Sequence, residues 1–334
     1  MMVKSKTNVK GKKMPKIGLA LGGGAAKGLA HIGVLKVLHK NKIYPDLIAG
    51  SSIGAIIGAA YAAGGSPDYL EDYSENVDFQ NLLDFCLPWV GLIKGQKVEG
   101  ILRELTHNKD FKDLNIPFQT IAYNITKRRR EVLDKGNLVK AIRASISLPG
   151  IFTPARIGKD EYIDGGVIDP CPADLLKDMG ADIIISVELF HKTKTVKAPK
   201  VKNRTFLEEF KEKFIAEELL VLENYIVPKK WPNFLRKLFT KLLNKLLYPA
   251  KVLRMLQGKE LPDAIKTMFI TQDVMFIELA KEKSRNSIAD IKIIPKFKAE
   301  SWYRFHETKH FIKLGEKAAE ENINEIKKLI RKKS

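Results

Sequence analysis

Two glycine-rich turns, each set between an apolar run and a helical pattern, constrain the fold of this chain more than any other feature. The run KIGLAL at residues 16–21 leads into the turn GGGAAKG at 22–28, and the run DLIA at 46–49 leads into GSSIG at 50–54. A short strand that passes through a tight turn into a helix is the building unit of a parallel sheet. Helices then cover both faces, so the strands are almost continuously apolar. The two turns therefore predict an α/β fold.

The rest of the chain extends this pattern and interrupts it once. Further strands are predicted at 116–123, 130–134 and 182–189 and near residue 290, with a hairpin around Gly158–Asp160 and helices at 138–145 and from 305 to the end. Between about 200 and 260 the sequence instead holds long, highly charged helical patterns. We expect one domain at 16–334, a mainly parallel sheet flanked by helices, with a basic helical insertion at about 200–260 and a basic tail at 1–15.

The second turn has the pattern that a serine nucleophile requires. Gly50-Ser51-Ser52-Ile53-Gly54 reads G-x-S-x-G between a strand and a helix, which is the setting of a nucleophile elbow. A glycine-bounded turn with a structural serine would give the same residues. The glycine turn one strand upstream favours catalysis, because the N–H groups of Gly23 and Gly24 can hold the oxyanion that forms when Ser52 attacks an ester.

The first turn does not fit either common nucleotide-binding pattern. A dinucleotide turn G-x-G-x-x-G that began at Gly22 would need glycine where Lys27 stands. A phosphate-binding loop would need lysine directly after Gly28, where Leu29 stands. We therefore interpret this turn as an anion-binding turn of another kind. His31, on the helix that follows, is expected to have a packing or helix-end role.

Asp164 is the best candidate for the base that activates Ser52. It stands in Tyr162-Ile163-Asp164-Gly165-Gly166 at the end of a predicted hairpin strand, where the glycines allow a close approach to another loop. An aspartate with the ordinary pKa of ~3.9 is a poor base at neutral pH, so burial must raise its pKa if it is to act. If the chain had no nucleophile, the same aspartate would be interpreted as a residue that stabilises a turn.

A histidine triad of the α/β-hydrolase type is the main alternative. The chain has six histidines, and none lies in a turn framed by glycine or proline. Such a triad would take its histidine from the residues after the acid, namely His191, His306 or His310. Several strands normally precede the elbow in that fold, whereas one strand and one helix precede Ser52 here. The order of elements therefore favours a dyad of Ser52 and Asp164.

Taken together, the motifs resemble those of the patatin-like phospholipases, in particular the small microbial members. They are Gly22-Gly23-Gly24-x-x-Lys27-Gly28, Gly50-x-Ser52-x-Gly54, the segment AIRASISLPGIFTP at 141–154, and Asp164-Gly165-Gly166. The likeness covers residues 16–190 and, more faintly, 286–330, but not the insertion. It implies a three-layer α/β/α fold, a dyad of Ser52 and Asp164, and an oxyanion hole at Gly22, Gly23 and Gly24. It also implies a phospholipase A or lysophospholipase type of fatty acyl ester hydrolysis, without a metal or an organic cofactor.

The positive charge of the chain is concentrated in two segments. Residues 1–16 hold six lysines and residues 224–259 hold nine basic residues, both without an acid, so they supply 15 of the 19 net charges. In the second segment apolar residues recur at helical spacing, and basic residues lie off that stripe. The apolar stripe comprises Trp231, Phe234, Leu235, Leu238, Phe239, Leu242, Leu243, Leu246 and Leu247, and the basic residues beside it are Arg236, Lys237, Lys241 and Lys245.

Two interpretations of this amphipathic segment stay open. It is either a surface helix packed on the core by its apolar face, or an interfacial helix in a layer of anionic lipid headgroups. Nucleic acid is not an expected partner, because the sequence has no helix-turn-helix, zinc-finger or RNP-type signature. A non-catalytic membrane-binding protein is a further alternative, which would bind liposomes without releasing fatty acid.

The remaining features concern the cellular location. Cys86 and Cys171 give neither a disulfide framework nor a zinc cluster, which fits a reducing compartment. No apolar region follows the first lysines as in a secretory signal, and no uncharged apolar run reaches the roughly 18 to 20 residues that span a bilayer. We expect a cytoplasmic enzyme with a lipid substrate, attached peripherally to the inner, anionic face of the membrane.

Overall fold

The computed structural model describes residues 14–77, 84, 93–190, 234, 263–297 and 304–334. The chain divides into two compact units, residues 1–194 with 276–334 and residues 195–275. Nearly all of the predicted basic tail and of the predicted insertion lies outside the described residues, as does Cys86. The sheet and its covering helices belong to the first unit.

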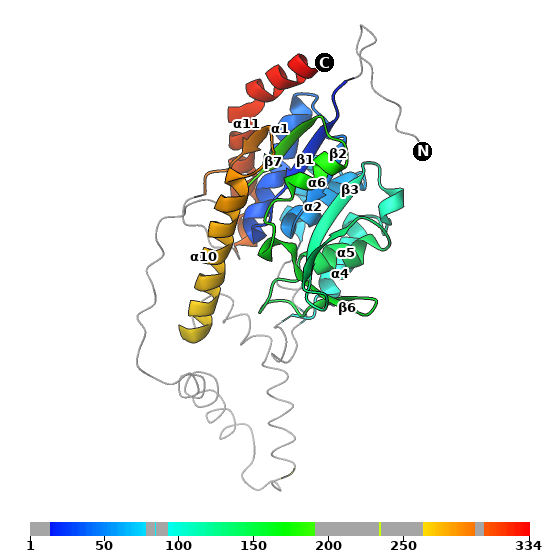
Figure 1. Cartoon of the computed structure of the whole chain (residues 1–334), viewed down its shortest axis with the longest axis vertical. Helices are drawn as coiled ribbons and strands as arrows, with labels where there is room; N and C mark the ends of the chain where they lie inside the picture. Colours follow the sequence, from blue (N-terminus) through cyan, green and yellow to red (C-terminus); the bar gives the residue numbers. More distant parts are fainter. Residues whose placement is uncertain (1–13, 78–83, 85–92, 191–233, 235–262, 298–303) are drawn as a thin grey trace. The chain divides into compact units, whose positions relative to one another are not determined.

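The described elements follow one another as strands that alternate with helices (Figure 1). The strands are β1 Ile17–Leu21, β2 Leu47–Gly50, β3 Phe118–Asn124, β4 Arg129–Leu133, β5 Ala155–Ile157, β6 Asp160–Asp164, β7 Ile183–Val187 and β8 Ile291–Ile293. The helices are α1 Ala30–Lys40, α2 Ile53–Ala62, α3 Pro67–Asn76, α4 Gln96–Leu105, α5 Leu138–Ser145, α6 Ala173–Asp178, α10 Asp263–Arg285 and α11 Thr308–Lys333. Short 3₁₀ turns stand at Ala25–Leu29, Phe111–Asp113, Gly165–Val167 and Phe305–Glu307.

The eight strands form one mostly parallel sheet in the order β5-β6-β3-β2-β1-β7-β8, with β4 also paired to β3. The neighbours β8, β7, β1, β2 and β3 are parallel, whereas β4 and β6 run antiparallel to β3. All five residues of β1 and of β7 are buried, as expected for strands covered on both faces. The predicted α/β fold with a mainly parallel sheet is therefore confirmed.

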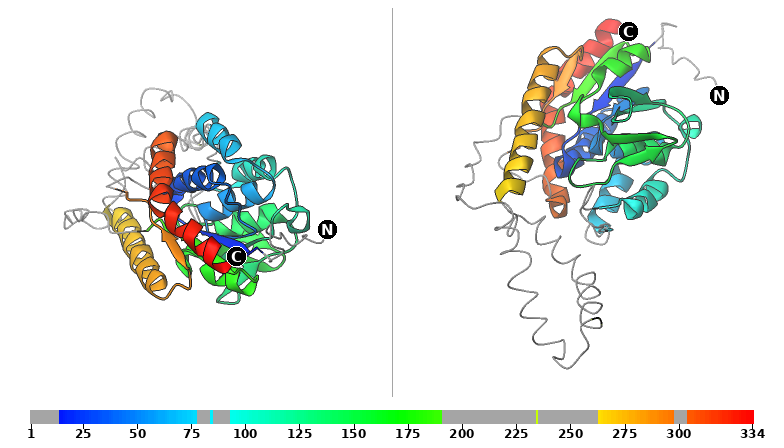
Figure 2. Two further views of the ribbon diagram at one scale, coloured as in Figure 1. Left: turned by 90° about the horizontal axis from the view of Figure 1, so that it is seen from above. Right: turned by 60° about the horizontal axis from the view of Figure 1, so that its bottom comes forward.

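Alternate residues of the central strands face two separate cores. Leu19 and Leu21 of β1 pack with the apolar residues of α1, α2 and α11, whereas Ala20 packs with Leu175 and Leu176 of α6. Helices thus cover both faces of the sheet, and the arrangement is a three-layer α/β/α fold (Figure 2). Among the helices that the structure describes, none is both long enough and apolar enough to cross a membrane.

The C-terminal helix joins this core through a close contact between two helices. A Cβ atom on Gly33 of α1 would lie 2.0 Å from the carbonyl oxygen of Ile312, and one on Gly315 of α11 would lie 1.9 Å from that of Ala30. No side chain fits at either position, so the helix backbones are in direct contact. Helix α11 is therefore part of the first unit, together with β1.

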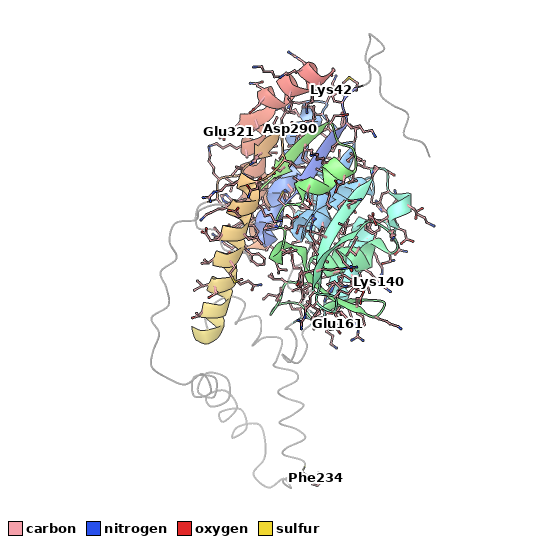
Figure 3. The ribbon with its side chains drawn as sticks, in the orientation of Figure 1. Lys42, Lys140, Glu161, Phe234, Asp290 and Glu321 are labelled. Atoms are coloured by element: carbon pink, nitrogen blue, oxygen red, sulfur yellow. The ribbon has the colours of Figure 1, made fainter. Side chains whose placement is uncertain are left out.

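Asp290, which is labelled in Figure 3, connects the edge strand to its neighbours. Its Oδ2 accepts a hydrogen bond of 2.8 Å from the N–H of Ile184 in β7, just before β8 begins. Its Oδ1 lies 3.3 Å from the Nζ of Lys333 at the end of α11. One carboxylate thus connects β7, β8 and α11.

Candidate active site

Ser52 occupies the sharp turn between β2 and α2. Its backbone has φ 54° and ψ −125°, a region that costs a non-glycine residue about 1–3 kcal/mol and that is typical of functional sites. The turn is tight on both sides: a Cβ on Gly50 would lie 2.5 Å from the oxygen of Gly54, and a Cβ on Gly54 would lie 2.1 Å from the oxygen of Leu21. Both glycines of the G-x-S-x-G pattern are therefore required by close backbone contacts.

Asp164, the last residue of β6, lies directly beside this serine. The hydroxyl of Ser52 donates a hydrogen bond of 2.6 Å to Oδ2 of Asp164, and the N–H of Gly166 donates one of 2.7 Å to Oδ1. Gly165 permits the approach, because a Cβ there would lie 2.4 Å from the oxygen of Ile121. The structure thus brings together the serine and the aspartate that the sequence singled out.

Burial raises the pKa of this carboxyl toward the value that a general base requires at neutral pH. Asp164 is only 2% exposed, and burial raises its pKa to about 7, while the bonds from Ser52 and Gly166 act in the opposite direction. No charged side chain in the described part of the chain contributes to this shift. A carboxyl with a pKa near neutrality can both accept a proton from a hydroxyl and return it.

The glycine turn lies against the nucleophile, but its amides are not all available. A Cβ on Gly23 would lie 3.2 Å from the Cβ of Ser52. The N–H of Gly22 donates to the oxygen of Val187 at 3.0 Å, and that of Gly23 donates to the oxygen of Pro170 at 2.8 Å. Within the described residues, the N–H of Gly24 has no such acceptor, and neither has that of Ile53 at the start of α2.

This pattern differs from an oxyanion hole built from Gly22, Gly23 and Gly24. The first two amides hold the turn against β7 and against the loop at Pro170, so they cannot also point at a substrate in this conformation. Gly24 and Ile53 are the amides that remain for an oxyanion. An amide after the nucleophile together with one from a separate loop is a common pair of donors.

The three motifs of the site fall within one segment that matches a known family. Residues 19–177 match the family model described as patatin-like phospholipase. This part of the chain is similar to the patatin-like phospholipases. That segment contains the glycine turn, the elbow and Asp164, and the family resemblance inferred from the motifs is confirmed.

Individual proteins and a solved structure are also similar to this chain. An uncharacterised NTE family protein of Mycobacterium tuberculosis is 32% identical over 184 residues, which are 54% of this chain and 51% of that protein. The lysophospholipase nte1 of Aspergillus fumigatus is 34% identical over 181 residues, 52% of this chain and 12% of that protein. The crystal structure of VipD from Legionella pneumophila has a TM-score of 0.45 at 13% identity, over 96% of this chain and 70% of that one. The chain spans about half the length of its mycobacterial relative.

Among the residues that the structure describes, the histidines of the alternative triad have other contacts than Asp164. His306 lies 3.9 Å from the carboxylate of Glu307 and is largely exposed, and the ring of His310 packs edge-on against Phe311 of α11. His191 lies outside the described residues. Within the described residues, the partners of the Asp164 carboxylate are Ser52 and Gly166, and no histidine is among them.

His31 holds the glycine turn through a hydrogen bond to its backbone. The ring is fully buried, and its Nε2 lies 2.8 Å from the oxygen of Gly22, which can only accept, so Nε2 carries the proton. Burial lowers the pKa of His31 to about 4, and the ring is therefore neutral at pH 7. Its role is to hold the turn rather than to transfer a proton, in line with the structural role expected from its place on the helix.

Lys27 and Gly28 also act within the fold of the turn. Lys27 is buried, and its Nζ lies 5.6 Å from the centre of the Phe297 ring, so the cation faces an aromatic ring. A Cβ on Gly28 would lie 2.2 Å from the side chain of Ile53, the residue after the nucleophile. Gly28 thus allows the glycine turn to approach the elbow, whereas Lys27 packs the turn against Phe297.

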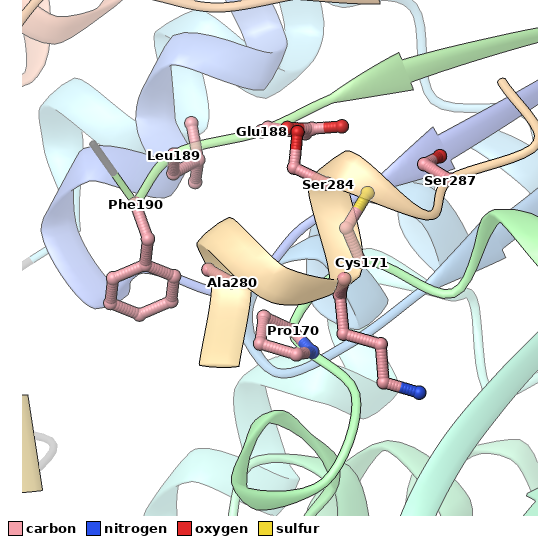
Figure 4. A pocket seen from close by; sticks show the side chains of 9 residues that line it. Pro170, Cys171, Glu188, Leu189, Phe190, Ala280, Ser284 and Ser287 are labelled. Carbon is pink, nitrogen blue, oxygen red and sulfur yellow. The ribbon is translucent and has the colours of Figure 1, made fainter. Parts of the chain in front are cut away.

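A small pocket lies next to the glycine turn, between the end of β7 and the last turns of α10 (Figure 4). Glu188, which is 8% exposed, and Leu189 form one wall, and a Cβ on Gly24 would lie 2.9 Å from Leu189. Phe190 stacks on Phe276 with ring centres 5.7 Å apart. Phe276 also lies 3.8 Å from the position of a Cβ on Gly166. An aromatic pair therefore borders the dyad, and sequence reasoning did not identify it.

Sequence reasoning also missed a group of buried hydroxyl residues behind the elbow. Ser145 and Ser147 lie in the segment 141–154 that resembles the family as a whole, but neither was singled out. Thr120 carried no signal, because a threonine in a strand is ordinary.

In the described residues no group of three or more His, Cys, Asp or Glu side chains has the arrangement of a metal site.

Proposed function

We propose that the protein is a serine lipid acyl hydrolase in which Ser52 is the nucleophile and Asp164 is the base. The observation that carries this proposal is the 2.6 Å hydrogen bond from Ser52 to a buried carboxylate whose pKa is about 7. The family model of the domain supports the same class of reaction, since it is that of patatin-like phospholipases.

The reaction would proceed in two halves. Asp164 takes the proton of Ser52 while Oγ bonds to the ester carbonyl carbon, and the N–H groups of Gly24 and Ile53 hold the resulting oxyanion. When the intermediate collapses, the ester C–O bond breaks and Asp164 returns the proton to the leaving alcohol. Water then attacks the acyl-enzyme with Asp164 as base, and fatty acid leaves as Ser52 regains its proton. Each amide donor of this kind contributes about 3 kcal/mol to the transition state.

The substrate that fits best is a fatty acyl ester of a phospholipid or lysophospholipid. The Aspergillus fumigatus relative is named a lysophospholipase, which supports this class. The stacked rings of Phe190 and Phe276 offer an apolar surface next to the dyad, as an acyl chain requires. The reaction needs no redox chemistry, so protons and electron pairs move between the substrate, water, Ser52 and Asp164.

The amphipathic segment would bring the enzyme to its substrate by binding an anionic membrane surface. Trp231, Arg236, Lys237, Lys241 and Lys245 lie outside the described residues. Phe234 of the apolar stripe is described, and it is helical with a side chain that is 69% exposed. An apolar stripe beside a row of basic residues is the pattern of an interfacial helix, which supports this part of the proposal.

Hydrolysis of lipid vesicles tests the proposed function. Vesicles of phosphatidylcholine with phosphatidylglycerol, and micelles of lysophosphatidylcholine, are incubated with the wild-type protein and with Ser52→Ala, and released fatty acid is measured by mass spectrometry. We expect release by the wild type and none above background by the variant. Binding of the wild type to vesicles without any release of fatty acid would instead support a non-catalytic membrane protein.

A further inference from the structure

A chain of hydrogen bonds joins the two sides of the nucleophile elbow through buried hydroxyl groups. The N–H of Ser52 donates to Oγ of Ser145 at 3.0 Å. Oγ of Ser145 lies 3.0 Å from Oγ1 of Thr120, which in turn lies 2.8 Å from the carbonyl oxygen of Gly50. Both hydroxyl residues are 0% exposed, so water cannot replace these bonds.

Counting protons fixes the direction of every bond in this chain. Each hydroxyl has a single proton, and a carbonyl oxygen can only accept. The proton of Thr120 therefore goes to Gly50, and the proton of Ser145 goes to Oγ1 of Thr120. The Oγ of Ser145 then accepts from the N–H of Ser52. All four groups are satisfied, and the chain runs in one direction from residue 52 back to residue 50.

The segment that carries Ser145 also contacts the base. Two residues further on, the carbonyl oxygen of Ser147 accepts a hydrogen bond of 3.0 Å from the N–H of Asp164. Arg143 fixes this segment, since its Nη1 donates to Oγ of Ser147 at 2.6 Å. Its Nη2 donates to the carbonyl oxygens of Lys94 at 2.6 Å and of Thr153 at 2.9 Å. The end of α5 thus contacts the backbone of both members of the dyad.

We propose that Thr120 and Ser145 are positioning residues that hold the strained backbone of Ser52 so that its hydroxyl meets Asp164. This inference rests on the proposed function. Without this chain of hydrogen bonds, the partly buried N–H of Ser52 would lose its acceptor, and its backbone at φ 54° would relax toward a less strained conformation. A displacement of about 1 Å at a reacting group lowers the rate by about a hundredfold.

Two substitutions at Thr120 separate the hydroxyl from its packing. Thr120→Val keeps the shape and removes the hydroxyl, whereas Thr120→Ser keeps the hydroxyl and leaves a small cavity. If the hydroxyl chain positions Ser52, Thr120→Val should lower kcat on a soluble short-chain ester by roughly tenfold to a hundredfold, with KM within about twofold of the wild type. Thr120→Ser should keep more than about half of kcat. If Thr120 matters only as a packing residue, the serine variant would be the poorer enzyme.

The pH profile supplies a readout that loss of folded protein would not change. The bond from Ser52 lowers the pKa of Asp164, so a looser bond must raise that pKa and move the acid limb of kcat/KM to higher pH. Partial unfolding would reduce the rate without moving the limb. Ser145→Ala needs no added space and serves as the second variant, for which we expect the same shift.

The result that would overturn the inference is distinct from failure of the proposed function. If the wild type hydrolyses the ester and Thr120→Val matches Thr120→Ser in kcat, or if the acid limb stays in place in both Thr120→Val and Ser145→Ala, Thr120 and Ser145 do not position the nucleophile. If the wild type hydrolyses no ester at all, the proposed function fails.

Discussion

Asp164 accepts a 2.6 Å hydrogen bond from Ser52 although 112 residues separate the two in sequence. Strand β6 delivers the aspartate by pairing with β3, which in turn lies beside β2 and the elbow. The sheet thus places a carboxylate and a hydroxyl at one edge, in a buried setting that shifts the pKa of the acid.

The activity should depend on pH through this carboxyl. The form of Asp164 that accepts a proton is the ionised one, and its pKa is about 7. For a soluble ester, kcat/KM should therefore rise along an acid limb with its midpoint close to pH 7, because lower pH protonates the base. A midpoint near the ordinary aspartate value of ~3.9 would contradict the role of burial described here.

The same rise in the pKa of Asp164 predicts that its ionised form destabilises the folded state at high pH. The pKa of Asp164 rises from 3.8 to about 7 on folding, so the folded state favours the neutral acid. The penalty is absent below pH 3.8, grows between the two values and is complete above about 7. Asp164→Asn resembles the neutral acid, so its free energy of unfolding should exceed that of the wild type at pH 8 by a few kcal/mol at most, at ~1.4 kcal/mol for each pKa unit.

Urea unfolding at several pH values measures this difference. The gap between Asp164→Asn and the wild type should be nearly constant above about pH 7 and narrow from there toward pH 4, while the variant is inactive throughout. A gap that is constant with pH would mean that the pKa of Asp164 is the same in the folded and unfolded states.

The contact between the glycine turn and the nucleophile gives a third prediction. Gly23→Ala would place a Cβ 3.2 Å from the Cβ of Ser52, so it should displace the nucleophile and lower kcat by at least about tenfold. Gly100→Ala in α4 is the matched control, because its Cβ would meet no atom within 4 Å. The control should keep full activity and gain about 0.5–1 kcal/mol of stability, as alanine does in a helix. Equal kcat in both variants, measured with a soluble ester, would show that the turn does not constrain Ser52.

Membrane binding is predicted to depend on where the charge lies and not only on its amount. Neutralising Arg236, Lys237, Lys241 and Lys245 with glutamine should weaken binding to vesicles with phosphatidylglycerol and slow hydrolysis of their lipid. Each basic residue near an anionic surface is worth about 1 kcal/mol, and salt should weaken the binding further. Hydrolysis of a soluble ester should stay close to that of the wild type.

A control with the same change in net charge makes this test specific. Glutamine at Lys42, Lys135, Lys140 and Lys159, four exposed lysines of the first unit, removes four charges elsewhere. Vesicle sedimentation should show strong binding for this control. If both quadruple variants lose binding equally, the overall charge controls attachment. If the first variant still binds fully, the segment is not the membrane-binding element.

Local signals in the sequence were sufficient for the elements that position the dyad. Helix α5 spans Leu138–Ser145 as predicted, and Asn137 caps it by accepting from the N–H of Lys140 at 2.9 Å. The elbow could be predicted because glycine and serine spacing alone reports a tight strand-to-helix turn. The order of these motifs along the chain then predicts the fold.

Other features depend on contacts between distant residues, and no local pattern reports them. Helix α6 has only six residues, too few to show a helical period. The amides of Gly22 and Gly23 looked available in the sequence, but Val187 and Pro170 accept them in the fold. Thr120 and Ser145 meet only because β3 and α5 pack together behind the elbow.

Labelling with a fluorophosphonate tests the role of the dyad most directly. The reagent forms a covalent adduct with an activated serine, and peptide mapping by mass spectrometry locates it. We predict one adduct, on Ser52, that is absent in Ser52→Ala and forms at least about a hundredfold more slowly in a folded Asp164→Asn, because the base no longer accepts the proton. Labelling of a different serine, or an unchanged rate in Asp164→Asn, would contradict the assignment of Ser52 and Asp164.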